Sequence, residues 1–243
     1  LLHGRDSDRG EQTLEEIRAA GGSRPHRLHL ADLASLEEVR RLAGEVEAQH
    51  SRLDALINNA GIGAGRGVGR ELSHDGYELR FQVNYLAGFL LTTLLLPLLR
   101  RSAPARVVNV ASAGQSPVDF DDLMLERGYD RWRAYTQSKL AQIVFTFELA
   151  GRLDGAEVTV NALHPATFMD TKMVREVATP ISSVEEGAEA TLRLVTAREL
   201  EGVTGKYFDG VGEARAHSQA YDPNVRRQLW GLSEELCGLG ALA

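Results

Sequence analysis

The sequence predicts an α/β fold in which helices cover both faces of one parallel sheet. Helical and strand patterns alternate along most of the chain, and the strands are short apolar runs rich in β-branched residues. Such strands are buried on both faces, which is typical of a doubly wound parallel sheet. In such a sheet ligands bind outside the carboxyl ends of the strands. We therefore expect a site where polar residues directly follow strands.

The expected strands are short apolar segments that end in turn residues. They cover residues 1–4, 27–31, 53–58, 106–110, 157–163 and 206–209. The first resembles the end of a strand already running into a turn, and the chain has no initiating Met. On this interpretation the chain is a single domain over residues 1–243, incomplete at its N-terminus, and the natural protein is longer.

The expected helices lie between these strands. They cover residues 10–20, 35–49, 73–101, 132–153, 184–197 and 224–236. Ser35 is expected to cap the second helix, with Glu38 as its capping-box partner. The longest apolar run, residues 85–99, contains Pro97 and is too short to span a bilayer comfortably, so it predicts a buried helix.

Composition and charge limit the classes of partner. The 243 residues are 43% hydrophobic and 25% charged, which suits a compact domain with a sizeable core. A net charge of −7 and a pI near 5.6 argue against a nucleic acid or an anionic membrane surface as partner. The single Cys237 excludes an internal disulfide framework, and no signal peptide is visible, so we expect a cytoplasmic protein. No metal site is predicted.

Tyr135 and Lys139 form the clearest chemical pair. They are four positions apart in the helix expected at 132–153, so they share a face one turn apart. A nearby ammonium favours a phenolate and lowers a tyrosine pKa from about 10, which would allow proton exchange with a carbonyl or alcohol oxygen. The alternative is a surface tyrosine beside a lysine that extends into solvent.

Other polar residues follow the expected strands directly. Asp32, Asn59, Ser112 and the pair His164-Pro165 each stand just after a strand. Because the carboxyl ends of parallel strands meet at one edge of the sheet, this placement predicts a single candidate site.

These motifs resemble those of the short-chain dehydrogenase/reductase family, most closely its retinol-dehydrogenase-like members. The matching pieces occur in the family's order and are Asp32-Leu33, Asn58-Asn59-Ala60-Gly61, Asn84 within residues 81–85, Ser112, Tyr135-xxx-Ser138-Lys139, and residues 161–165 ending in His164-Pro165. Ser112 lies 23 residues before Tyr135, a long connection that is also similar to the retinol-dehydrogenase-like branch. The resemblance implies a Rossmann-like fold and a hydride-transfer enzyme.

The resemblance also implies a role for each catalytic candidate. Tyr135 would give or take the proton, and Lys139 would lower its pKa and bind the nicotinamide ribose. Ser112 would hold the substrate oxygen, and Asn84 would anchor a water that exchanges protons with Lys139. The implied cofactor contacts, besides Tyr135 and Lys139, are Asp32 and Leu33 at the adenine, Asn59, Ala60 and Gly61 at the adenosine ribose, and Pro165 and Thr167 at the nicotinamide.

Each of these residues has a structural alternative. Asn84 could be a helix-interior residue satisfied by backbone, and Ser112 or Asp32 could cap a following turn or helix. The Asn58-Asn59-Ala60-Gly61 segment could be a plain turn, and the His164 side chain could be structural.

Two neighbouring residues bear on the cofactor. Arg5 sits just past the first strand, where family members that use the phosphorylated dinucleotide place a basic residue, and a guanidinium can bind a 2′-phosphate bidentately. Asp6 could instead bind the bare ribose hydroxyls of NAD. We expect NADP, with NAD as the alternative; Arg9 is expected to be a solvated residue at the helix start.

The sequence departs from the family in two places. The glycine-rich phosphate loop, expected about 20–30 residues before Asp6, is absent. Residues 61–67 do not replace it, because no helix opens directly after them. We therefore expect a sheet without its first strand and weak dinucleotide binding by the chain as printed. In addition, Ala166 follows Pro165 in place of the usual glycine, so Thr167 or Thr171 could supply the nicotinamide contact.

The predicted function is NADP(H)-dependent interconversion of a carbonyl and an alcohol, as in a carbonyl reductase or alcohol dehydrogenase, on a small and fairly apolar substrate. The alternative is a catalytically silent dinucleotide sensor on the same fold. Residues 168–180 are expected to form a lid over the pocket. Its apolar side chains indicate a hydrophobic ligand unless they are core; they are Phe168, Met169, Met173 and Val174. The resemblance also implies a possible homodimer through the two long helices.

Overall fold

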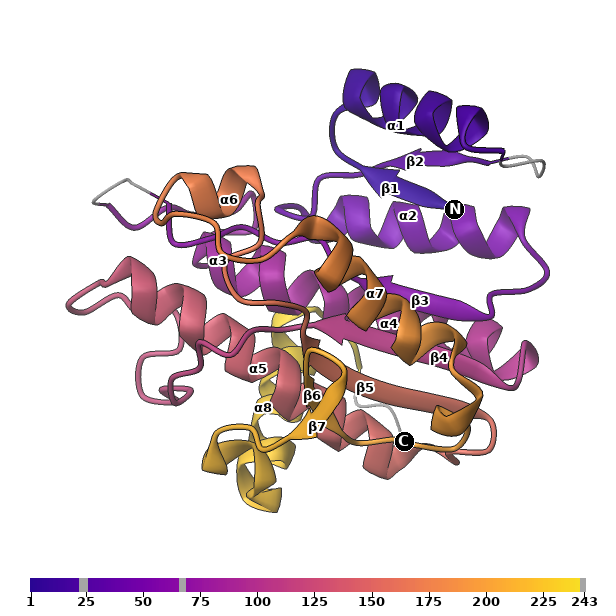
Figure 1. Ribbon diagram of the computed structural model, residues 1–243. Helices are drawn as coiled ribbons and strands as arrows, with labels where there is room; N and C mark the ends of the chain where they lie inside the picture. The colour runs from indigo at the N-terminus through magenta and orange to yellow at the C-terminus, as the bar shows by residue number, and fades with distance from the viewer. Residues whose placement is uncertain (22–25, 66–68, 241–243) are drawn as a thin grey trace.

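The computed structural model describes residues 1–21, 26–65 and 69–240 and confirms an α/β fold with a parallel sheet (Figure 1). All six predicted strands are found. They are β1 (Leu2–Gly4), β2 (Leu28–Leu30), β3 (Ala55–Asn58), β4 (Ala105–Val110), β5 (Val158–His164) and β6 (Tyr207–Asp209). A further strand, β7 (Gly212–Ala214), pairs antiparallel with β6 and was not predicted.

The strands form two sheets rather than the one expected. β1 pairs in parallel with β2, and the second sheet has the order β3-β4-β5-β6-β7. A cavity of about 340 Å³ lies between the two sheets, lined by Leu2 and His3 on one side and by residues 55–58 on the other. The presence of a further strand at this position in the natural protein stays a prediction.

Helices cover both faces of the larger sheet, as the sequence predicts. The described helices are α1 (Ser7–Ala19), α2 (Leu36–Gln49), α3 (Leu79–Phe81), the π-helical turn η1 (Gln82–Leu86), α4 (Ala87–Arg101), α5 (Arg131–Arg152), α6 (Lys172–Arg175), α7 (Val184–Thr196), the 3-10 turns η2 (Arg198–Leu200) and η3 (Ser218–Tyr221), and α8 (Pro223–Leu236). Successive residues of β4 point to opposite faces. Val107 packs in the core formed with α4, α5 and α8, and Val108 packs with Leu194 of α7.

Side-chain caps set two helix boundaries that the sequence placed differently. The helix expected from residue 73 begins at Leu79, because the Glu78 carboxylate accepts a hydrogen bond from Phe81 N and caps the first turn. Ser35 caps α2 as predicted. The prediction that Glu38 completes a capping box with Ser35 is wrong, however, because the Glu38 carboxylate accepts from the backbone N–H of Asp32 and not from that of Ser35.

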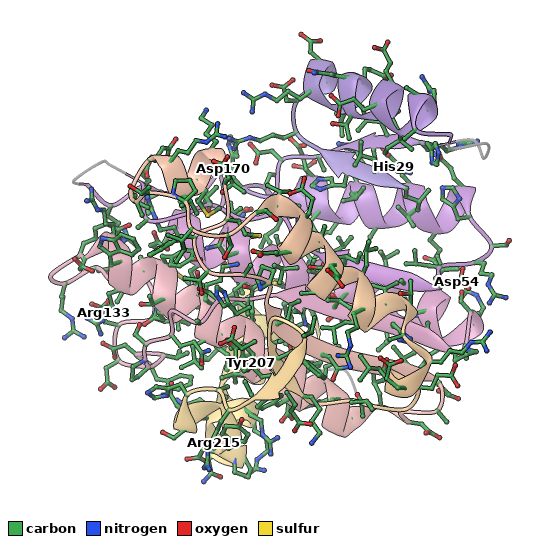
Figure 2. All side chains as sticks on the ribbon, in the orientation of Figure 1. His29, Asp54, Arg133, Asp170, Tyr207 and Arg215 are labelled. Carbon is green, nitrogen blue, oxygen red and sulfur yellow. The ribbon has the colours of Figure 1, made fainter. Side chains whose placement is uncertain are left out.

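The apolar helix is buried, as predicted for residues 85–99. Among the described residues, the continuous helix Leu79–Arg101 is long and apolar enough to cross a membrane by length and composition. It packs in the protein instead, with 61% of its most apolar window buried. Charged side chains such as Arg133, Asp170 and Arg215 project from the surface, whereas Tyr207 of β6 is buried (Figure 2).

Candidate active site

The parallel register brings the predicted polar residues to one edge of the sheet. Asn58 is level with Asn109, and Val110 is level with Leu163. The residues that follow, Asn59, Ser112 and His164-Pro165, therefore emerge together. This confirms the expectation that motifs far apart in the chain converge at the carboxyl ends of the strands.

Tyr135 and Ser112 meet at this edge. The half-buried Tyr135 lies in the second turn of α5, where the neighbouring Ser112 side chain favours the charged form of its phenol. Ser112 is held by the loop that follows β4: its Oγ accepts from Gly114 N at 3.1 Å, and its carbonyl oxygen accepts from the Tyr207 hydroxyl at 3.2 Å. The Ser112 hydroxyl keeps its own hydrogen to donate.

The expected lowering of the Tyr135 pKa is wrong for this structure. Burial raises the pKa of the phenol, and the neighbouring Ser112 side chain offsets only part of that rise. The Lys139 ammonium lies 5.9 Å from the centroid of the Tyr135 ring and donates to Val110 O at 2.9 Å and to Gln142 Oε1 at 3.0 Å. Burial lowers the pKa of Lys139 to about 8.

Asn84 lies in η1 and joins three segments. Its Oδ1 accepts from Ile62 N at 2.7 Å, and its Nδ2 donates to Ile62 O at 3.0 Å and to Ser138 Oγ at 2.9 Å. The side chain is satisfied by backbone and by Ser138, as the structural alternative expected. A water could be held only through the second lone pair of Oδ1, so the role of Asn84 as a water anchor stays a prediction.

The predicted cofactor contacts of the first half of the chain lie along the same edge. Arg5 is exposed just after β1, and Asp32 and Leu33 follow β2. Asp32 Oδ1 accepts from Ala34 N at 3.0 Å, which closes a local turn. Leu33, Asn59 and Ala60 line the cavity between the sheets together with Asn84.

Gly61 supports the fit of a dinucleotide at this edge. A Cβ at this position would stand 3.1 Å from Asn84 Oδ1 and 3.6 Å from Lys139 Nζ, so only glycine leaves the approach to the ammonium open. The two hydrogen bonds of Lys139 use two of its three N–H groups, which leaves one for a ribose hydroxyl. The residues present therefore fit the ribose and nicotinamide end of the cofactor.

The segment after β5 distinguishes the two candidate threonines. The Thr171 hydroxyl caps α6 by accepting from Val174 N. Thr167 is exposed, and its Oγ1 shares a 3.0 Å hydrogen bond with His164 Nε2. Burial lowers the pKa of His164, which agrees with a neutral, structural imidazole. Pro165 is buried between these residues and the sheet.

Sequence reasoning missed a buried charged cluster beside the site. Arg80 and Glu78 are 5% and 1% exposed, and the Tyr129 hydroxyl contacts both. Gln142, which binds Lys139, was also missed. The available signal was Arg80 itself, a charge one turn before Asn84 at the start of the most apolar stretch of the chain.

Comparisons with known proteins agree with this geometry. A family model described as short chain dehydrogenase matches residues 1–181. Human retinol dehydrogenase 14 is 42% identical to this chain over 224 residues. The matched region covers 86% of this chain but only 66% of the length of the human protein. An uncharacterized protein from Mycobacterium paratuberculosis superposes with a TM-score of 0.74 at 31% identity, covering 97% of this chain and 82% of its own. A short chain dehydrogenase from Shigella flexneri, solved with NADP, has a TM-score of 0.67 at 25% identity, covering 86% and 84%.

Proposed function

The chain belongs to the short-chain dehydrogenase family of NAD(P)-dependent oxidoreductases, and we propose that it interconverts a carbonyl and an alcohol on a small apolar substrate with NADP(H). The observation that carries this proposal is that the Ser112 and Tyr135 side chains meet beside the buried Lys139, whose ammonium lies 5.9 Å from the centroid of the Tyr135 ring. The cofactor identity and the substrate are the parts that need testing.

The pair suits proton transfer to an oxygen that develops negative charge. When bound, the dinucleotide supplies or accepts the hydride at the carbonyl carbon. Ser112 would donate a hydrogen bond to the substrate oxygen, and Tyr135 would give it a proton in reduction or take one in oxidation. A phenol whose pKa burial raises is protonated at neutral pH, so it can donate a proton to the substrate oxygen in reduction.

Arg5 and Asp6 support NADP over NAD. The Asp6 carboxylate caps α1 by accepting from Arg9 N at 3.1 Å, so it is already engaged within its own helix. Arg5 is exposed at the end of β1 and makes no hydrogen bond or ion pair with the described residues. A free guanidinium at this position can bind a 2′-phosphate. The Shigella flexneri structure solved with NADP shares this fold.

The segment expected to act as a lid supports an apolar substrate. Phe168 is 45% exposed and Ile181, which donates its N–H to Phe168 O, is 70% exposed. Phe168 also has a positive φ of 48°, a strained conformation for a bulky residue that is often found at functional sites. The name of the relative retinol dehydrogenase 14 makes retinal the first substrate to test.

Consumption of NADPH and of NADH with retinal and with shorter apolar aldehydes tests the proposal. Tyr135→Phe should abolish turnover while keeping the thermal unfolding midpoint, and Tyr221→Phe, which removes only a hydroxyl that accepts from Ala216 N, should keep turnover. Turnover that survives in Tyr135→Phe would contradict the assigned chemistry. A wild-type chain that binds dinucleotide without turnover would favour the alternative, a dinucleotide sensor.

The proposal also includes the predicted domain organisation, location and oligomeric state. We propose a single domain, a cytoplasmic location and a homodimer that involves α4 and α5. The packing of α8 on α5 covers part of that helix, so the contact would fall mainly on α4 and the exposed part of α5. Analytical ultracentrifugation of the purified chain checks the dimer.

A further inference from the structure

Side chains from a single helical segment hold three consecutive backbone carbonyls of the loop after β3. We call residues 61–65 the strap. Asn84 Nδ2 donates to Ile62 O at 3.0 Å, Arg80 Nε donates to Gly63 O at 3.0 Å, and Arg80 Nη2 donates to Ala64 O at 2.8 Å. Arg80 and Asn84 are one turn apart, so one face of the segment fixes the strap along its length.

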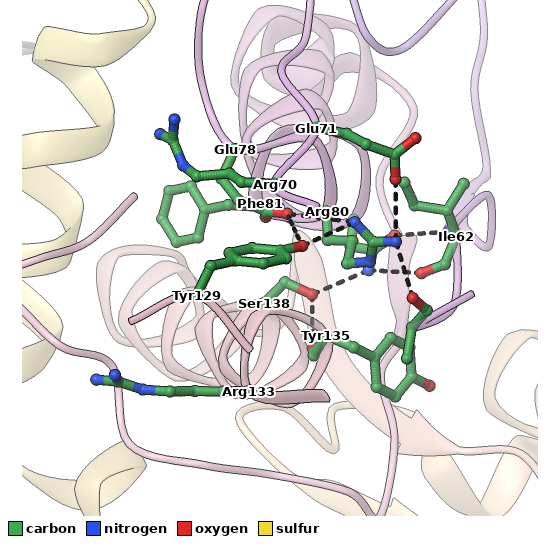
Figure 3. Close-up of polar contacts among 12 residues, drawn as sticks. Ile62, Arg70, Glu71, Glu78, Arg80, Phe81, Tyr129, Arg133, Tyr135 and Ser138 are labelled. Carbon is green, nitrogen blue, oxygen red and sulfur yellow. Dashed lines mark hydrogen bonds and ion pairs between the residues drawn. The ribbon is translucent and has the colours of Figure 1, made fainter. Parts of the chain in front are cut away.

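Every N–H group of the Arg80 guanidinium donates a hydrogen bond. Its five N–H groups have five acceptors among the described residues: Gly63 O, Ala64 O, Glu71 Oε2 at 3.2 Å, Glu78 Oε1 at 3.5 Å and the Tyr129 hydroxyl at 3.0 Å. Figure 3 shows Glu71, Glu78 and Tyr129 gathered around Arg80, with Ile62 and Tyr135 beside it. The planar fork of an arginine can serve carbonyl and carboxylate acceptors together in a way that lysine cannot.

Glu78 and Tyr129 hold Arg80 in place from the other side. Glu78 is 1% exposed, so its carboxylate balances the buried guanidinium, and its second oxygen caps the helix at Phe81 N. The Tyr129 hydroxyl donates to Glu78 Oε1 at 3.1 Å. Tyr129 belongs to the connection between Ser112 and Tyr135, so the cluster ties that connection to the strap. No step of the proposed proton transfer uses any of these three groups.

The strap itself separates the catalytic residues from the lid segment. At one end, a Cβ on Gly61 would meet Asn84 and Lys139. In the middle, a Cβ on Gly63 would stand 2.7 Å from Met173 Cγ, so Met173 of α6 packs directly on the strap backbone. A shift of the strap would therefore move the surface on which Met173 rests.

We propose that Arg80 is a positioning residue of the active site: by fixing Gly63 O and Ala64 O it holds the strap between Lys139 and Met173 and so shapes the wall of the substrate pocket. This inference rests on the proposed function. It assigns to Arg80 an effect on the binding of the organic substrate, exerted through the strap, rather than a part in proton transfer. Loss of Arg80 should therefore raise the KM for the apolar carbonyl substrate and leave kcat nearly unchanged.

The test uses a pair of variants that separate positioning from folding. Arg80→Met alone leaves Glu78 buried without its counter-charge, which destabilises the protein. Adding Glu78→Gln removes that charge and keeps an acceptor for Phe81 N. The double variant should recover the unfolding midpoint. Its KM should stay raised by about tenfold, which corresponds to a loss of about 1.4 kcal/mol of substrate binding.

Arg70→Met is the matched control. Arg70 also binds a backbone carbonyl, Met124 O at 2.8 Å, and lies 3.8 Å from the Glu126 carboxylate, but it does not touch the strap. It should leave the KM unchanged. Hydrogen exchange gives a readout that needs no turnover: amides of residues 62–65 should exchange faster in the double variant, and those of α2 should not.

The outcomes separate this inference from the proposed function. A raised KM together with faster strap exchange supports it. Faster strap exchange with an unchanged KM would show a purely structural role and overturn it, as would an equal effect of Arg70→Met. A wild-type chain without turnover would contradict the proposed function instead, and strap exchange would then decide whether Arg80 holds the strap.

Discussion

Lys139 lies beside Tyr135 on α5, yet its ammonium donates to Val110 O and Gln142 Oε1 and not to the phenol hydroxyl. The two side chains share a helix face as their spacing requires, but a backbone carbonyl at the end of β4 competes for the ammonium. The pKa of the phenol is consequently set by burial, which raises it, and by Ser112, which lowers it. Because the two groups have different partners, the protonation of Lys139 can be measured separately from that of Tyr135.

The stability of the chain should rise with pH in the range where Lys139 loses its proton. Burial lowers the pKa of Lys139 to about 8 from 10.5, so the unfolded chain binds this proton more tightly than the folded one. The lysine therefore opposes folding below about pH 8, and the penalty is lost as pH rises toward 10.5. The full effect is at most about 3 kcal/mol, at 1.36 kcal/mol per pKa unit.

Urea unfolding of the wild type and of Lys139→Met at several pH values between about 7 and 9.5 measures this rise by difference, because the opposing contribution of Cys237, whose pKa burial raises to about 12, is common to both. Lys139→Met should remove the rise while leaving the rest of the pH profile unchanged. A rise of the same size in Lys139→Met would show that another group causes it.

Gly61→Ala should damage catalysis more than folding. The new Cβ would stand 3.1 Å from Asn84 Oδ1, so the Asn84 side chain must shift by a few tenths of an ångström, and it would touch Lys139 Nζ at 3.6 Å. We expect kcat/KM to fall by about tenfold or more, as small misplacements in active sites do. Gly44→Ala is the control: it lies exposed in α2 with nothing within 4 Å, and should stabilise the protein by about 0.5–1 kcal/mol without affecting turnover. Unchanged kcat/KM in Gly61→Ala would mean that this backbone position does not matter.

Arg5→Ala should discriminate between the two dinucleotides. If Arg5 binds a 2′-phosphate, its loss removes a charge-assisted contact and should raise the KM for NADPH by about tenfold, a cost near 1.4 kcal/mol. The KM for NADH should not change, because NADH has no 2′-phosphate. Arg9→Ala is the control, since Arg9 lies against Asp6 at the surface. Equal effects on both dinucleotides would remove the basis for NADP preference.

The sequence was sufficient to predict the strands and the convergence of Ser112 with Tyr135. The strands depend on local apolar runs such as Val107-Val108, whose identity is readable without knowing the fold, and parallel pairing then aligns their ends. The short strand β7 was missed because Gly212–Ala214 is only three residues long and has no apolar alternation. Its pairing with β6 exists only in three dimensions.

The misjudged parts of the site depend on partners that are distant in sequence. Tyr129 lies 49 residues from Arg80, and Val110 lies 29 residues from Lys139, so no local spacing connects either pair. The start of α3 has a local cause instead. A Leu72–Glu78 bridge and the Glu78 cap hold residues before Leu79 out of the helix although their apolar spacing suits one.

Asn84→Asp should destabilise the chain in a pH-dependent way. The Asn84 amide donates to Ile62 O and to Ser138 Oγ. A carboxylate can donate to neither, so both acceptors would lose their hydrogen bond and would lie beside a buried negative charge. Leaving such groups unsatisfied costs about 1–3 kcal/mol. Burial raises the pKa of a carboxyl group, so the folded variant binds a proton more tightly than the unfolded chain. The loss should shrink as pH falls from about 7.5 to 5, because protonation restores one donor.

Urea unfolding at both pH values measures this change in the loss of stability. The control is Asn224→Asp on the surface of α8, where Oδ1 already accepts from Arg227, and it should show no such loss. A loss in Asn84→Asp that stays constant over this range would mean that the donor capacity of Asn84 is not what holds the strap to α5.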